Sequence, residues 1–230
     1  MKNYLADSVF FGAVLSLIAY EAGLLMKKKF KLAILNPLLI ATVCVMVVLL
    51  LFKVEYQHYN EGAKYISYLL TPATVCLAVP LYQQLELLKK NLKAVAGGIT
   101  AGVLASLISV LLLAKLFSLS HEQYVTLLPK SITTAIGMGI SEELGGIQTI
   151  TVAVIIVTGI LGNVIAEFVC KFFRIEEPIA KGLALGTASH AIGTAKAMEL
   201  GKIEGAMSSL AIAVAGLLTV IGASVFANFM

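Results

Sequence analysis

Charged residues are scarce in this sequence, and their scarcity decides its class. Asp, Glu, Lys and Arg make up 13% of the 230 residues, whereas 59% belong to the apolar set. Soluble domains usually contain about 25% charged and about 45–50% apolar residues. The composition therefore excludes an ordinary soluble enzyme and leaves no region for a soluble catalytic domain.

The motifs of common catalytic and metal sites are also missing. The sequence has no GxxxxGK[ST] phosphate loop, no Cys/His metal spacing and no serine nucleophile elbow. Paired glutamates can indicate a glycosidase, but this chain offers no soluble sugar-binding cleft. The three cysteines, Cys44, Cys76 and Cys170, fall in or at the end of apolar stretches, where cysteine behaves as a small hydrophobe. We predict a non-enzyme with no disulfide, metal or cofactor.

Long uncharged stretches take the place of these motifs. A bilayer is crossed by about 20 apolar residues, and residues 33–52, 95–114 and 147–166 contain no charge. The sequence predicts an all-α, polytopic membrane protein with about six transmembrane helices. They are expected near residues 8–26, 33–52, 66–82, 95–117, 147–170 and 205–228. Residues 125–146 and 182–202 are too polar to face lipid, so we expect two re-entrant or broken-helix segments.

Basic residues predict the orientation. Ten bases fall in residues 27–31, 83–94 and 171–181, and short basic loops mark the cytoplasmic side. The net charge of +4 thus reflects membrane orientation rather than a nucleic-acid partner. Lys27, Lys28 and Lys29 follow the first apolar run without a small-x-small cleavage pattern, so this run is expected to stay as a helix. We predict a multi-pass protein of the bacterial plasma membrane with both termini external.

A repeat links the two polar segments. An offset of 56 residues aligns Thr134-Ala135-Ile136-Gly137 with His190-Ala191-Ile192-Gly193, and Glu143-Leu144-Gly145 with Glu199-Leu200-Gly201. Because one crossing separates the copies, 131–170 and 187–226 would form an inverted repeat, as in many secondary transporters.

Pro129-Lys130-Ser131 opens the first copy. If this segment is helical, Lys130 shares a face with Thr133 or Thr134 and with Gly137. Proline suits the first turn of a helix, where free N–H groups attract anions. We therefore predict a substrate-binding set of Lys130, Ser131, Thr133 and Thr134. Alternatively, Lys130 extends to the headgroups, as lysines near helix ends often do.

The second copy adds Thr187, Ser189 and His190 to this set. Two interpretations fit His190: it binds a carboxylate or relays a proton, or it is a hydrogen-bonded packing residue. Glu143 and Glu199 occupy matching positions in the two copies. They are either coupling groups with raised pKa values or solvated interfacial residues.

Two proline-containing motifs complete the candidates. Pro72 and Pro80 flank Thr74 within a short crossing, where they either break a helix that lines the site or cause a packing kink. Asn36 precedes Pro37 and is expected to be a helix cap rather than a ligand.

The motifs together resemble those of the LrgB/CidB family of membrane proteins. The likeness rests on Leu70-Thr71-Pro72-Ala73-Thr74, Pro80-Leu81-Tyr82, Pro129-Lys130-Ser131, Gly186-Thr187-Ala188-Ser189-His190 and Glu204-Gly205-Ala206-Met207-Ser208-Ser209-Leu210. It implies either antiholin-like or holin-like control of murein hydrolase activity and cell lysis, or transport of small carboxylates such as pyruvate, glycolate or glycerate. The plastid relatives carry a fused LrgA-like portion and the bacterial ones a small LrgA/CidA partner. This chain contains no such portion.

We expect a secondary carrier of small monocarboxylates that works by alternating access and is linked to cell lysis. The alternative is a lysis regulator with no solute site. The sequence favours the carrier, because such a regulator has no evident need for two polar repeats. A channel is a third possibility, which saturable counterflow would distinguish from a carrier. Residues 1–60 are expected to form scaffold helices of a homodimer in the lipid bilayer, and residues 61–230 a transport core.

Overall fold

The computed structural model describes residues 8, 10–30, 35–76 and 78–230, of which 70, 71, 74 and 81 are described by backbone alone. Throughout these residues the chain forms helices and turns, with no strand. This confirms the predicted all-α class. By internal contacts the chain divides into two compact units, residues 1–76 and 77–230.

The described residues of unit 1 form four helices. They are α2 (Phe11–Phe30), α3 (Pro37–Phe52), α4 (Tyr56–Ser67) and α5 (Leu70–Cys76). Asn36 is the N-cap of α3, and its side chain accepts hydrogen bonds from the N–H groups of Leu38 and Leu39 at 2.8 and 3.3 Å. Its predicted role as a cap is confirmed, since it supplies an acceptor that the first turn of a helix lacks.

In unit 2, residues 78–230 form eight helices and a short 3-10 turn. The first four are α6 (Ala78–Gln83), α7 (Leu85–Lys90), α8 (Leu92–Leu116) and α9 (His121–Leu127). The others are α10 (Thr134–Glu143), α11 (Gln148–Phe172), α12 (Pro178–Leu200) and α13 (Lys202–Phe226), followed by a 3-10 turn at Ala227–Phe229.

Three helices are long and apolar enough to cross a bilayer in the described part of the chain: α8, α11 and α13, the last extended by the 3-10 turn. The shorter α3 is also apolar, with 16 residues. Large apolar side chains such as Leu112, Leu161 and Leu217 remain exposed on the long helices, as expected for lipid-facing positions. These helices establish a membrane protein with fewer clear spans than the six predicted.

Small residues allow α13 to pack closely in the core of unit 2. Ala211, Ala215 and Ala223 are buried with Ile99 and Leu107 of α8. Lipid chains are as apolar as leucine, so helices in a membrane associate through close packing rather than through hydrophobicity. The spacing of four residues from Ala211 to Ala215 keeps these contacts on one face of α13.

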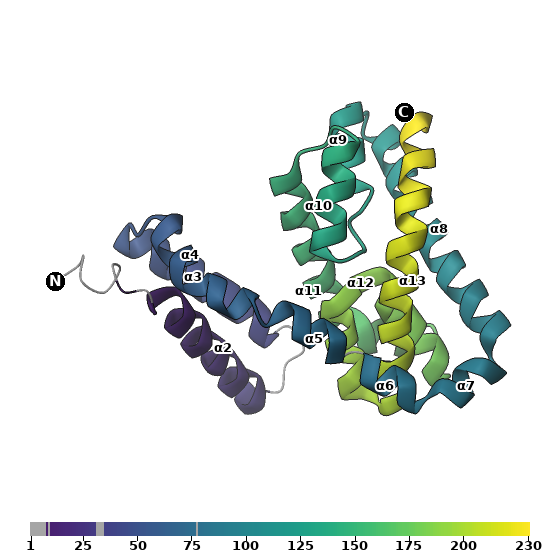
Figure 1. Ribbon diagram of the computed structural model, residues 1–230, viewed down its shortest axis with the longest axis horizontal. Helices are drawn as coiled ribbons and strands as arrows, with labels where there is room; N and C mark the ends of the chain where they lie inside the picture. Colours follow the sequence, from purple (N-terminus) through teal and green to yellow (C-terminus); the bar gives the residue numbers. More distant parts are fainter. Residues whose placement is uncertain (1–7, 9, 31–34, 77) are drawn as a thin grey trace. The chain divides into compact units, whose positions relative to one another are not determined.

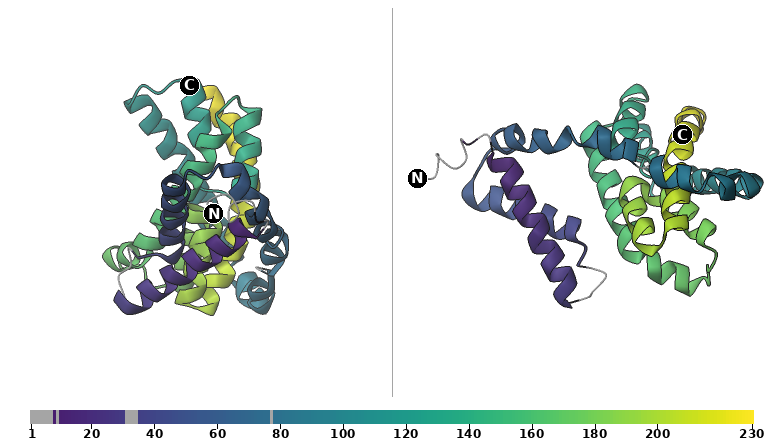
Figure 2. Two further views of the ribbon diagram at one scale, coloured as in Figure 1. Left: turned by 90° about the vertical axis from the view of Figure 1, so that its left-hand side faces the viewer. Right: turned by 60° about the horizontal axis from the view of Figure 1, so that its bottom comes forward.

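Two helical hairpins approach this core from opposite ends (Figures 1 and 2). The first hairpin comprises α9, the turn 128–133 and α10, and Tyr124 donates to the Phe226 carbonyl at the C-terminal end of α13. The second hairpin is α12, whose Gly182 and Met198 both pack against the N-terminal turns of α13. Each segment thus returns to the end from which it starts.

Candidate functional site

The tip of the first hairpin is a turn rather than a helix start. The Lys130 N–H donates to the Leu127 carbonyl at 3.1 Å and that of Ile132 to the Pro129 carbonyl at 3.4 Å, and each bond closes a four-residue turn. Helix α10 begins only at Thr134, with Thr133 as its N-cap. The prediction that Lys130 shares a helical face with Thr134 and Gly137 is therefore wrong, because successive turns replace the expected first helical turn.

A chain of polar groups nevertheless leads inward from Lys130. Its ammonium group donates to Ser131 Oγ at 2.9 Å, and Ser131 Oγ lies 3.0 Å from Ser106 Oγ in the middle of α8. Ser131 is buried, while Lys130, Thr133 and Thr134 are half-buried. The hydroxyl groups give the lysine a partner within the protein, a contact that extension toward the headgroups does not require.

The second hairpin turns at a break inside α12. Ser189 has φ −136° and ψ 17°, and His190 has φ 42° and ψ −138°, so neither residue is helical. A positive φ is uncommon for residues other than glycine and costs of order 1–3 kcal/mol in the sparsely populated regions. Surrounding contacts must hold His190 in this conformation.

Those contacts come from the middle of α11. His190 Nε2 lies 2.9 Å from the main-chain oxygen of Ile155, while Asn163 Nδ2 donates to the Ile192 carbonyl at 3.0 Å. The ring of His190 and the side chain of Ser189 occupy the space over Gly159 and Gly162, where any side chain would collide with them. The two glycines therefore form the seat for the tip of the second hairpin.

Further hydroxyl groups line the two limbs of α12. Thr187 Oγ1 donates to the Leu183 carbonyl and lies over Gly102 of α8. On the returning limb, Thr194 Oγ1 lies 2.7 Å from Ser208 Oγ of α13, and both side chains are buried. A groove of about 400 Å³ between α8 and α12 runs from Asn91 to Thr187. Thr187, two residues before the break in α12, is the lining residue nearest in sequence to the tip.

The two tips share Ile155 as a neighbour. Its side chain fills the space beside Gly137 of the first hairpin, and its carbonyl oxygen faces His190 of the second. No hydrogen bond joins the two hairpins in the part of the chain that the structure describes. The predicted proximity of Thr133 and Ser189 therefore stays a prediction.

The predicted coupling glutamates lie away from the tips. Glu143 and Glu199 are both exposed at the far ends of their hairpins. Glu199 accepts from Lys196 Nζ at 3.3 Å, and the same ammonium group pairs with Glu167 of α11 at 2.5 Å. Both carboxylates are exposed in the structure, and the choice between the two interpretations stays open.

Pro72 and Pro80 lie in two short helices, α5 and α6. Helix α6 packs against α13 within unit 2. Pro72 belongs to unit 1, and the side chain of Thr74 lies outside the described atoms. The role of these three residues in lining a site stays a prediction, although short helices do replace the single crossing expected at residues 66–82.

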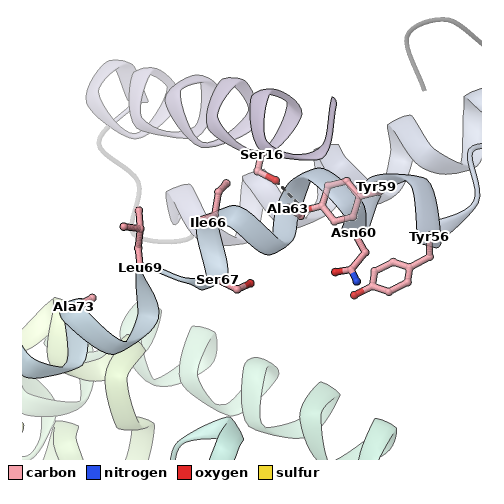
Figure 3. Close-up of a pocket in the computed structure, with 9 residues that line it drawn as sticks. All are labelled: Ser16, Tyr56, Tyr59, Asn60, Ala63, Ile66, Ser67, Leu69 and Ala73. Atoms are coloured by element: carbon pink, nitrogen blue, oxygen red, sulfur yellow. Dashed lines mark hydrogen bonds between the residues drawn. The ribbon is translucent and has the colours of Figure 1, made fainter. Parts of the chain in front are cut away.

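A separate pocket occurs within unit 1 and is lined in part by α4. No helix was predicted from the sequence between residues 53 and 65. Figure 3 shows the lining of the pocket, which includes Ser16 of α2 and Tyr56, Tyr59 and Asn60 of α4. Its volume is about 550 Å³, and Ser16 Oγ lies 2.8 Å from Tyr59 Oη at one side. Helix α4 is rich in polar residues, so no apolar run in the sequence marks it.

Comparison with known proteins agrees with the resemblance noted above. The LrgB-like family model matches residues 16–229. The chain belongs to the LrgB-like family. It is 40% identical over 222 residues to the antiholin-like protein LrgB of Bacillus cereus strain B4264, covering 96% of each chain, and equally similar to that of Bacillus anthracis strain CDC 684. No solved structure matches the chain. Within the LrgB-like fold described here, the broken α12 and its seat on α11 form the candidate site.

Sequence reasoning missed several residues of this site. Ser106, Asn163, Thr194 and Ser208 all contact the hairpins through side-chain hydrogen bonds. Asn163 carried a usable signal, because it is an amide inside the uncharged stretch 147–166. Polar groups inside membrane helices are expected to face protein or water rather than lipid.

Proposed function

We propose that this chain is an antiholin-like membrane protein that affects cell lysis by moving a small monocarboxylate across the plasma membrane. The first part of this proposal rests on its relatives, which are named antiholin-like protein LrgB. The second part rests on one observation: α12 is broken at Ser189 and His190 beside the middle of α11.

The break supports transport because of its depth. Because Gly159 and Gly162 lie near the centre of the 25-residue helix α11, the proposal places the tip of the second hairpin near the bilayer midplane. Non-helical backbone at that depth is tolerated only within protein or beside an aqueous cavity. Broken helices of this kind form the substrate and ion sites of many secondary transporters.

The helix boundaries support the inverted repeat. The helical limb that follows His190 begins at residue 191, 57 residues after the start of α10 at Thr134, and helix α11 begins and ends 56 residues after α8. This offset is the one that aligns the sequence motifs. Under the proposal, the two hairpins are related copies that alternately expose one site to each side.

Lys130 is proposed to supply the positive charge for a substrate carboxylate. Ser131, Thr133 and Thr134 from the first hairpin and Thr187, Ser189 and His190 from the second provide the remaining polar groups. An ammonium–carboxylate hydrogen bond is roughly twice as strong as a neutral one. This composition favours pyruvate, glycolate or glycerate over an uncharged solute. His190, Glu143 and Glu199 are the candidate groups for coupling to protons or cations.

The competing proposal is a regulator of murein hydrolase activity with no solute site of its own, and the name of the relatives, antiholin-like protein LrgB, favours this role. Uptake of labelled pyruvate, lactate, glycolate and glycerate into proteoliposomes separates the two. Saturable uptake with counterflow supports the carrier, whereas uptake without saturation and without counterflow indicates a channel. If the folded protein shows no uptake, either alone or with an LrgA/CidA-like partner, the regulator is the remaining proposal.

The homodimer proposed for residues 1–60 is checked by the mass of the purified protein.

The proposed topology has cytoplasmic loops at residues 27–31, 83–94 and 171–181 and external termini. Single cysteines at 28 and 175, in a variant without the native cysteines, test it by labelling of intact cells. Label reaching either residue from outside would overturn this orientation.

A further inference from the structure

A second charged pocket lies where α11 ends and α12 begins. Its volume is about 370 Å³, and its charged lining consists of Glu167, Lys171, Arg174, Glu176 and Lys181. None of these residues belongs to the hairpin tips. The pocket is therefore a site separate from the proposed carboxylate site, and the argument for it does not depend on transport.

The pocket has an excess of positive charge. Lys196 forms an ion pair with Glu167, so this carboxylate is already neutralised by a residue outside the lining. Lys171, Arg174 and Lys181 form no ion pair within the described part of the chain. With Glu176 as the remaining acid, the lining offers unpaired cationic groups around a cavity that can hold an anion.

Arg174 occupies a backbone position where glycine is the usual residue. It follows the end of α11 with φ 53°, and the N–H of Ile175 closes the helix end by donating to the Cys170 carbonyl at 2.8 Å. Glycine is preferred at such a helix end because it has no Cβ to strain the left-handed conformation. An arginine here is disfavoured by the backbone, and it is one of the residues that line the pocket.

The pocket also lies at the depth of lipid headgroups. A helix of 25 residues is about 37 Å long, whereas the hydrocarbon core is about 30 Å thick. The last turn of α11 therefore reaches the headgroup layer. Phe168, Phe172 and Phe173, exposed by 70, 68 and 66%, form a contiguous aromatic cluster on this turn and offer an apolar surface beside the pocket.

We infer that this pocket binds the phosphate of an anionic phospholipid, with the acyl chains along Phe168 and Phe172. Arginine matches the planar geometry of phosphate oxygens, and the lysines add point charges. Basic pockets between membrane helices are known sites for acidic headgroups. A bound lipid would tie the start of α12 to the end of α11 and so fix the base of the second hairpin.

Native mass spectrometry of the purified full chain in detergent tests this site. Phosphatidylglycerol is titrated against phosphatidylcholine, and the fraction of lipid-bound protein is measured. Arg174→Gly should weaken phosphatidylglycerol binding by about tenfold, the loss expected for one charge-assisted hydrogen bond. This variant should fold, because glycine is favoured at φ 53°. Lys181→Gln, which leaves the helix end unchanged, should act in the same direction.

Lys53→Gly is the matched control. Lys53 also follows a helix with a left-handed conformation, φ 52°, and the substitution removes one positive charge that is not part of the lining of this pocket. Binding should be unchanged in this variant. Equal losses in Lys53→Gly and Arg174→Gly, or no loss in Arg174→Gly and Lys181→Gln, would overturn the proposal.

A soluble arm identifies the source of the phosphate. Inorganic phosphate and glycerol phosphate are added to the phosphatidylglycerol complex at increasing concentration. Retention of the lipid at millimolar concentrations of both anions supports a headgroup site. Full displacement at micromolar concentrations would reassign the pocket to a free anion and remove the lipid from the proposal.

Discussion

His190 Nε2 lies 2.9 Å from the main-chain oxygen of Ile155, which joins the strained turn of one helix to the middle of another. The carbonyl of Ile155 already belongs to the hydrogen-bonding pattern of α11, so the imidazole uses the second lone pair of that oxygen. The backbone of His190, with φ 42°, is held by this contact and by the packing over Gly159. Strain is thus located at the residue that sequence reasoning named as a proton or carboxylate partner.

Replacing His190 with glycine should separate stability from function. Relief of about 1–3 kcal/mol of backbone strain offsets the loss of a hydrogen bond worth about 0.5–1.5 kcal/mol. The free energy of unfolding should therefore fall little or rise, while carboxylate uptake is strongly reduced. Thermal unfolding in detergent and proteoliposome uptake measure the two effects.

His190→Ala serves as the comparison, because it removes the ring but keeps the strain. It should be less stable than His190→Gly by about 1 kcal/mol or more. Equal stabilities of the two variants would show that the left-handed conformation of residue 190 does not strain the backbone.

Gly162→Ala should disturb the seat of the second hairpin. An added methyl group would collide with the Ser189 side chain, and overpacking of this kind typically costs about 1–3 kcal/mol. We expect a lower thermal midpoint together with reduced uptake. Gly97→Ala is the control, since nothing lies within 4 Å of a methyl group added there. If both variants behave like the parent protein, the close approach of α12 to α11 is wrong.

The sequence was sufficient to predict where the polar segments lie, but not their backbone. The abundance of Gly, Ser and Thr in residues 182–202 indicated a segment unsuited to lipid, and α12 is indeed broken. The break at Ser189 and His190 depends on Ile155 and Gly162, which are distant in sequence. No local pattern marks histidine for a positive φ, because tertiary contacts impose it.

Lys130 shows the opposite case, in which a local rule failed. Proline at position 129 resembles a first helical residue, yet α10 begins at Thr134. Ser131 and Ile132 are buried, and a continuous helix could not place them as the turn does. Local propensity yielded to the packing of the hairpin tip against α8, where Ser106 contacts Ser131.

Lys130→Ala should weaken the apparent affinity for carboxylate by roughly 10- to 150-fold, corresponding to a charge-assisted hydrogen bond of about 1.5–3 kcal/mol. The concentration dependence of uptake provides the measurement. Lys115→Ala is the matched control, because this lysine lies exposed in the last turn of α8. Unchanged affinity in Lys130→Ala would identify Lys130 as an interfacial anchor rather than a substrate contact.

A disulfide between cysteines at positions 133 and 189 tests the proposed inverted repeat. Both positions lie at hairpin tips, and Ile155 contacts both hairpins, so the proposal brings them together near the midplane. A disulfide requires Cα atoms within about 7 Å. Oxidation of the double variant, in a background without Cys44, Cys76 and Cys170, should give an intramolecular cross-link that blocks uptake and is reversed by reductant.

The pair 143 and 199 is the control for that experiment. These positions are related by the same 56-residue offset, but the proposal places them at opposite ends of unit 2, so they should not cross-link. Cross-linking only at 133 and 189 indicates that the matching hydroxyl residues meet at the tips. Absence of that cross-link in folded protein would remove the shared site, and the role of a lysis regulator without a solute site would then account better for the chain.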